Sequence, residues 1–170
     1  MFRNMTNTIY MKSRLLFLIA VISIFFSSCG KRTVFEQRQK FDDLKWNRFK
    51  ELKFEFAIKD TSQLYNFSLL LRHHSIYPYG ELFVTMALYS PSGERRVSDF
   101  HLPVKKEDGT FKAEGNGDLW DIDYPLFKSY KFSEAGKYRI ELENRMDKLD
   151  TEGVMEIGIQ VKEAAEDDSK

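Results

Sequence analysis

Four stretches of the chain alternate apolar and polar side chains with a period of two, and this pattern restricts the fold more than any other feature. They are residues 52–58, 65–71, 138–143 and 155–161. Successive side chains of a β-strand point to opposite faces, so the alternation is typical of strands with one buried face. It predicts that Ile140 is buried and that its neighbours Arg139 and Glu141 face solvent.

The segments between these strands are less uniform. Residues 82–89 are apolar on both alternating sets, which predicts a central strand covered on both faces. The short connection between residues 52–58 and 65–71 predicts that these two strands form an antiparallel hairpin. Further expectations are a polar strand at 95–102, a short strand at 110–113, an irregular aromatic segment at 119–132, and either an edge strand or a helical turn within 34–49.

Strands that recur about every ten residues, with turn signals between them, predict an all-β protein. We expect a single antiparallel β-sandwich domain over residues 34–162, followed by a disordered tail at 163–170. Immunoglobulin-like and jelly-roll topologies both fit this pattern. No repeat is visible at the periods of solenoids or propellers.

The N-terminus has the features of a secretory signal peptide, which we assign to residues 1–28. Lys12 and Arg14 precede a twelve-residue apolar run at 15–26, which is shorter than the roughly 20 residues of a membrane-spanning helix. Met11 is a second candidate start, because the sequence from there forms a complete signal.

Cys29 is the only cysteine of the chain, and it follows this signal directly. The sequence Phe-Ser-Ser-Cys at 26–29 looks like a lipobox, in which the cysteine is lipidated and becomes the first mature residue. Ordinary secretion would instead leave an unpaired thiol in an oxidising compartment, where cysteines normally pair. We therefore predict a palmitate-bearing lipid anchor at Cys29, joined to the domain by a tether at 29–33.

Composition limits the classes of function. Residues 1–28 hold three basic residues and no acidic one, so the remaining 142 residues carry 23 basic and 26 acidic side chains, a formal net charge of −3. That balance excludes a concentrated basic surface for nucleic acid. One domain with a sizeable core is the expectation for this length.

No motif predicts catalysis, a cofactor or a small-molecule substrate. The neighbours His73 and His74 would point to opposite faces of a strand, and His101 stands apart, so we predict no metal site. Asp118, Asp121 and Asp123 make an oxygen-rich stretch, for which turn formation is a better explanation than calcium binding. We expect that the protein is not an enzyme.

Four segments, in this order, resemble the GldH family of gliding-motility lipoproteins of Bacteroidetes. They are YNFSLLLRHHSIYPYGEL at 65–82, the glycine-bounded stretch 109–115, GKYRI at 136–140 and GVMEIG at 153–158. The resemblance implies a component of the cell-envelope machinery for gliding, which overlaps the type IX secretion apparatus. No acidic run follows Cys29, and by analogy this favours the periplasmic face of the outer membrane.

Two kinds of binding surface are consistent with these residues. Loops on rigid scaffolds often carry recognition, so we expect a protein partner to contact the loop at 72–81 through Arg72, His73, Tyr77, Pro78 and Tyr79. The alternative role of this loop is structural, with the rings capping the sandwich and a carboxylate holding the arginine. A glycan- or peptidoglycan-binding sandwich is the second functional class, with Tyr77, Tyr79, Trp120 and Tyr124 as stacking rings.

Overall fold

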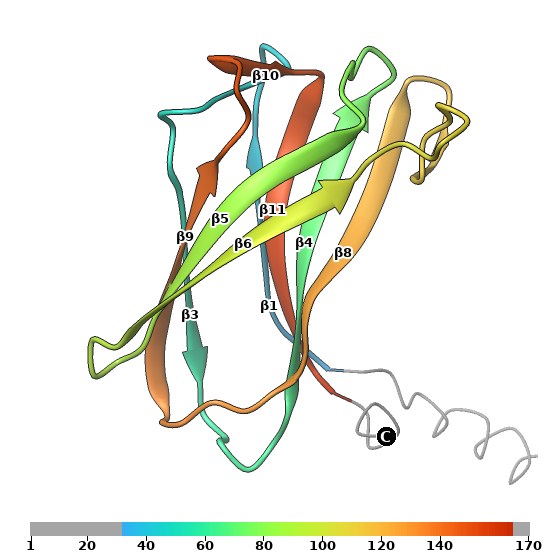
Figure 1. Cartoon of the computed structure of the whole chain (residues 1–170). Helices are drawn as coiled ribbons and strands as arrows, with labels where there is room; N and C mark the ends of the chain where they lie inside the picture. The colour runs from blue at the N-terminus through green and yellow to red at the C-terminus, as the bar shows by residue number, and fades with distance from the viewer. Residues whose placement is uncertain (1–31, 165–170) are drawn as a thin grey trace, which may run out of the picture. The chain divides into compact units, whose positions relative to one another are not determined.

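The structure, a computed structural model, describes residues 32–164, so the signal peptide, Cys29 and residues 165–170 lie outside the described residues. The described part consists of β-strands and the turns that join them, as predicted (Figure 1). The strands are β1 (Thr33–Lys40), β2 (Lys45–Asn47), β3 (Leu52–Ile58), β4 (Tyr65–His74), β5 (Glu81–Tyr89), β6 (Arg95–Pro103), β7 (Glu114–Asn116), β8 (Leu119–Tyr130), β9 (Gly136–Asn144), β10 (Asp150–Glu152) and β11 (Val154–Glu163).

The strands form two antiparallel sheets that face each other. One sheet has the order β1-β11-β4-β8-β7 and the other the order β3-β9-β5-β6, while β2 and β10 form a separate two-stranded ribbon. Aromatic rings meet between the sheets: Phe56 of β3 lies 5.4 Å from Phe35 of β1 and 6.1 Å from Phe67 of β4, measured between ring centroids. The protein is therefore a β-sandwich, as the alternation predicts.

The order of pairing decides between the two topologies that the sequence left open. Among the eight long strands, the first pairs with the last (β1 with β11), the second with the seventh (β3 with β9), the third with the sixth (β4 with β8), and the fourth with the fifth (β5 with β6). This is one long hairpin wrapped into two sheets, which is the jelly-roll arrangement.

The predicted hairpin of residues 52–58 and 65–71 is wrong. β3 and β4 belong to different sheets, and β3 pairs with β9 while β4 pairs with β11 and β8. The connection between them crosses from one sheet to the other. Both strands bury one face in the same core, so their apolar alternation fits a crossover as well as a hairpin.

The segment at 119–132 is also more regular than expected. Residues 119–130 form β8, which pairs with β4 along most of its length, and two register shifts near Phe67 explain why its alternation is broken. Pro125 falls beyond the part of β8 that pairs with β7, so only β4 lies beside it there. The short strand expected at 110–113 lies instead at Glu114–Asn116, and Phe111 makes a single bridge to Lys105.

Other expectations hold in whole or in part. Residues 33–40 form an edge strand and not a helical turn. β5 is central, between β9 and β6, but on its outer face Phe83, Thr85 and Tyr89 are only half-buried. The register of β9 is as predicted, with Ile140 in the core and Arg139 outside it. β11 continues through Glu163, so the last strand includes the first residue of the expected tail.

The core fills the space between the sheets and continues under the β2–β10 ribbon. Phe132 lies at one end of it, within 6.0 Å of the rings of Phe56, Tyr65 and Tyr138. Trp46 of β2 is fully buried at the other end, where its indole donates a hydrogen bond to the carbonyl of Lys50 at 2.9 Å. These aromatic contacts make the two ends of the sandwich closed and rigid.

Candidate functional site

The two ends of the sandwich differ in what they carry. At one end, the backbone of Arg32 accepts a hydrogen bond from Glu163, and Ala164 donates one to Leu64. We call this the N-terminal end, because β1 begins there (Figure 1). The loop at 75–80 follows β4, whose ten residues span about 33 Å, so it lies at the opposite, far end.

Tyr77 holds the far-end loop in place. Its side chain is fully buried, its hydroxyl donates to the carbonyl of Glu81 at 3.1 Å, and burial raises the pKa of the phenol. Gly153 has φ +79° and lies against the backbone of Tyr77, where a Cβ atom would come within 2.7 Å of Cα. A partner cannot reach the ring in this conformation, so Tyr77 takes the structural role and not the predicted contact.

His73 is likewise part of the core. It is fully buried, its ring centroid lies 4.6 Å from that of Phe111 and 5.3 Å from that of Tyr77, and Nδ1 lies 3.1 Å from the carbonyl of His74. Burial lowers the pKa of His73, because the charged imidazolium loses its water. Its Nε2 has no hydrogen-bond partner among the described residues. The predicted contact of a partner with His73 is thus excluded in this conformation.

The exposed part of the loop is Ile76, Pro78 and Tyr79. Ile76 is 58% exposed, and Tyr79 is half-buried with its hydroxyl 3.5 Å from the carbonyl of Asp150. Beside Tyr79 lies a cavity of about 400 Å³, lined also by Phe83 and Met146. Two further exposed apolar side chains, Phe49 and Leu149, lie near the β2–β10 ribbon at the same end.

Arg72, the remaining predicted contact residue, lies on the outer face of the five-stranded sheet. Its guanidinium binds Asp121 with two hydrogen bonds of 2.9 and 3.0 Å and lies 3.6 Å from Glu156. Lys40 and Arg38 of β1 also approach the Glu156 carboxylate, each at 3.8 Å. Side chains of four neighbouring strands therefore form one ion-pair network across the sheet.

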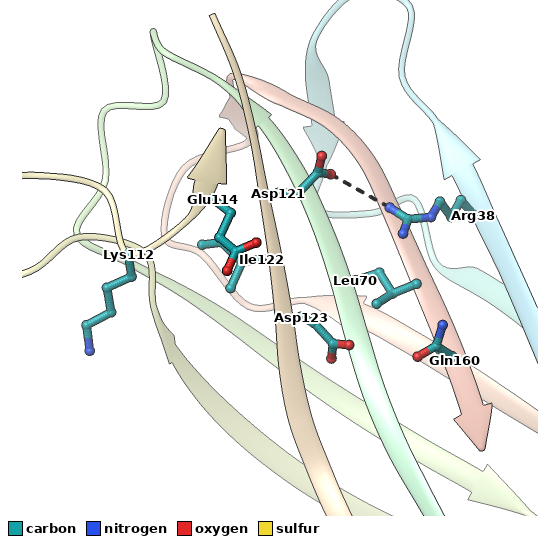
Figure 2. A pocket seen from close by; sticks show the side chains of 8 residues that line it. All are labelled: Arg38, Leu70, Lys112, Glu114, Asp121, Ile122, Asp123 and Gln160. Carbon is teal, nitrogen blue, oxygen red and sulfur yellow. Dashed lines mark ion pairs between the residues drawn. The ribbon is translucent and has the colours of Figure 1, made fainter. Parts of the chain in front are cut away.

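A depression of about 410 Å³ lies beside this network (Figure 2). The polar lining comes from β1, β7, β8 and β11 and from Lys112, which precedes β7. The apolar lining residues are Leu70 of β4 and Ile122 of β8. The sequence did not predict that these positions meet. Arg38, Glu156 and Gln160 were missed for that reason, since alternation gives the face of a side chain and not its neighbours on other strands.

The aspartates at 118, 121 and 123 do not converge. Asp118 accepts a hydrogen bond from the hydroxyl of Ser75 at 2.6 Å, Asp121 binds Arg72, and Asp123 lies on β8 at the depression. His101 packs edge-to-face against Phe83, on the other sheet, with ring centroids 4.6 Å apart. Within residues 32–164, no three His, Cys, Asp or Glu side chains are placed to hold a metal ion.

The rings considered for glycan binding do not form one platform. Tyr77 and Tyr124 are buried, and the Tyr124 hydroxyl donates to the carbonyl of Pro103 at 2.6 Å. Trp120 and Tyr79 are partly exposed, but Trp120 packs against Phe111 with ring centroids 5.3 Å apart. Two of the four rings are therefore unavailable to a sugar.

Fold and surface together define a jelly-roll β-sandwich with a closed aromatic core, a polar outer sheet face and an exposed far-end loop. In the described part of the chain, no helix is long and apolar enough to span a bilayer.

The chain belongs to the GldH lipoprotein family, whose model matches residues 33–161. It is 25% identical to the gliding motility lipoprotein GldH of Flavobacterium johnsoniae over 153 residues, covering 86% of this chain and 93% of that one. It is 23% identical to a GldH homolog of Christiangramia forsetii over 155 residues, covering 87% and 94%. The protein is thus a membrane-anchored lipoprotein of the gliding-motility GldH family. A solved structure of infectious bursal disease virus is similar to it only weakly, with a TM-score of 0.28 and 10% identity over 79% of this chain and 30% of the other.

Proposed function

We propose that the protein is a non-enzymatic component of the envelope machinery for gliding and type IX secretion, anchored by a lipid on Cys29 at the periplasmic face of the outer membrane. The family match over residues 33–161 is the observation that carries this proposal, because it spans almost the whole sandwich.

The short tether supports a domain held close to the membrane. β1 begins at Thr33, four residues after Cys29, and four extended residues span at most about 14 Å. A lipid on Cys29 would therefore place the N-terminal end of the sandwich at the bilayer surface. The far-end loop would be available to a protein partner in the aqueous compartment.

The partner contact in this proposal is the exposed part of the far-end loop. Ile76 and Tyr79 are the accessible large side chains of a loop that Tyr77 and Gly153 hold rigid. An apolar contact on a pre-organised loop costs little conformational entropy on binding. Neither His73 nor Tyr77, both of which are buried, is needed for this contact.

The test is complementation of a strain that lacks the chain, with colony spreading and secretion of a type IX cargo as readouts. Ile76→Asp should reduce both by severalfold while the amount of membrane-bound protein stays constant. Val97→Asp, which places the same charge at an exposed apolar site on β6, is the matched control and should behave like the unmodified chain. Full activity of Ile76→Asp would overturn the far-end contact.

The anchor is tested separately. Cys29→Ala should abolish incorporation of labelled palmitate and release the exported chain from the membrane. Labelling that persists in this variant would refute lipidation at Cys29, whatever the outcome for Ile76.

A further inference from the structure

The depression on the outer face of the five-stranded sheet contains hydrogen-bond acceptors that nothing in the described part of the chain satisfies. Gln160 is 8% exposed, and its Oε1 is buried without a hydrogen-bond partner (Figure 2). A buried carbonyl oxygen without a donor carries a free-energy cost, and native proteins rarely leave one. A ligand that donates a hydrogen bond would remove this cost.

The orientation of the Gln160 amide follows from its other neighbour. Nε2 donates to Oε2 of Glu36 at 2.5 Å, and an ionised carboxylate can only accept. This hydrogen bond also lowers the pKa of Glu36, which favours the ionised form. Turning the amide over would place two acceptors against each other. The carbonyl oxygen is therefore fixed on the side of the depression.

Two carboxylates at the same depression are unpaired. Asp123 and Glu114 form no hydrogen bond or ion pair with another described residue. Asp121, by contrast, already binds Arg72 through both oxygens. In Figure 2 the Asp123 carboxylate and the Gln160 amide extend toward each other, with Leu70 close by.

The two basic residues of the lining leave these acceptors unsatisfied. Arg38 is turned to Glu36, Asp121 and Glu156, at 3.2, 4.0 and 3.8 Å. Lys112 lies at the rim, and Figure 2 shows its ammonium directed away from Asp123. The depression therefore offers unsatisfied hydrogen-bond acceptors and negative charge, which suit a cation that donates hydrogen bonds.

We propose that this depression binds an arginine side chain of a partner protein. A guanidinium is planar, carries five donors and is weakly hydrated, so it can lie on Leu70 while it donates to acceptors on several sides. An ammonium is a compact and strongly hydrated charge and fits such a half-apolar floor less well. A volume of about 410 Å³ is within the range of ligand pockets, about 300–1,000 Å³. This surface is distinct from the far-end loop, and the inference does not rest on that contact.

The test is a titration of the ¹⁵N-labelled, detergent-solubilised full chain with butylguanidinium, followed by NMR. The Gln160 side-chain amide and the backbone amides of Leu70 and Asp123 should shift together. Butylammonium should bind more weakly, and butyrate should not shift these signals.

Variants locate the site. Asp123→Asn and Gln160→Met should each weaken butylguanidinium binding about 10-fold, the effect of removing one hydrogen bond to a charged group. Lys112→Gln should strengthen binding, because it removes a like charge from the rim; a variant that is merely misfolded cannot do this. Glu55→Gln, an exposed acid on the other sheet, is the matched control and should leave binding unchanged.

Three results would overturn the proposal. One is the absence of saturable binding of butylguanidinium. A second is equal binding by the Asp123→Asn variant, the Gln160→Met variant and the unmodified chain. The third is a response of the same amides to Ca²⁺ but to neither organic cation, which would identify a metal site.

Discussion

Replacement of Tyr77 tests whether the far-end loop is held by its own tyrosine. Tyr77→Ala removes a fully buried ring that contacts His73 and Tyr79, and it deletes the hydrogen bond to the carbonyl of Glu81. Truncation of a buried aromatic side chain to alanine costs about 3–5 kcal/mol of unfolding free energy. Tyr77→Phe removes the hydroxyl alone and should cost about 1 kcal/mol.

Tyr79→Ala is the matched variant, because the same side chain is removed from the same loop at a half-buried position. It should cost about 1–2 kcal/mol, since less apolar area returns to water. Urea titrations followed by far-UV circular dichroism give the three values, provided that the slope of free energy against urea stays constant. If Tyr77→Ala cost no more than Tyr79→Ala, the loop would not be packed as described, and the structural role of Tyr77 would be refuted.

Three further predictions concern the core, the outer face and pH. Ile140→Ala should lower the unfolding free energy by about 2–5 kcal/mol in urea titrations and Arg139→Ala by less than about 1 kcal/mol, because Ile140 lies in the core and Arg139 is half-buried outside it; equal losses would mean a wrong register for β9. Glu156→Gln should lower the unfolding free energy by about 1–3 kcal/mol, because Lys40, Arg38 and Arg72 lose the carboxylate that they share. If 1 M salt left this difference between the variant and the unmodified chain unchanged, its cause would not be electrostatic. The pKa of His73 is lower in the folded state than in the unfolded chain, so as the pH falls the unfolded chain binds a proton at a higher pH than the folded protein does. The contribution of His73 to the unfolding free energy should therefore be constant above about pH 6.5. Below that pH it should fall by up to about 1.4 kcal/mol per pH unit, until the folded-state pKa is reached. His73→Phe should flatten that fall in unfolding free energy measured from pH 5 to 8, and an unchanged slope would exclude His73 as its source.

The alternation along the chain was sufficient to predict most strands and their buried faces. In β3 and β9, every second side chain lies in the core, as the sequence indicates, because the pleat of a strand sends neighbouring residues to opposite faces whatever the strand's partner. The edge strand β1 was one of two open alternatives for its segment. Only the structure excluded the helical turn, by pairing β1 with β11.

The long strand β8 shows where local pattern fails. Its two register shifts and Pro125 interrupt the period of two, so residues 119–132 look irregular in the sequence. Pairing with β4 nevertheless holds the segment extended, since backbone hydrogen bonds along that strand offset the local breaks. A bulge changes which residue faces inward without ending the strand.

The candidate sites depended still more on tertiary structure. The sequence singled out His73 and Tyr77 as polar aromatic residues of a loop, but packing against Phe111 and Gly153 buried them. It put Gln160 in an alternating strand and Asp123, 37 residues earlier, in a segment that looked irregular, with no sign that they share a depression. The physical reason is that alternation records only whether a side chain is buried, whereas the backbone groups that pair strands are the same in nearly every residue. Which strands become neighbours, and hence which side chains meet, is decided by how the whole jelly roll closes around its core.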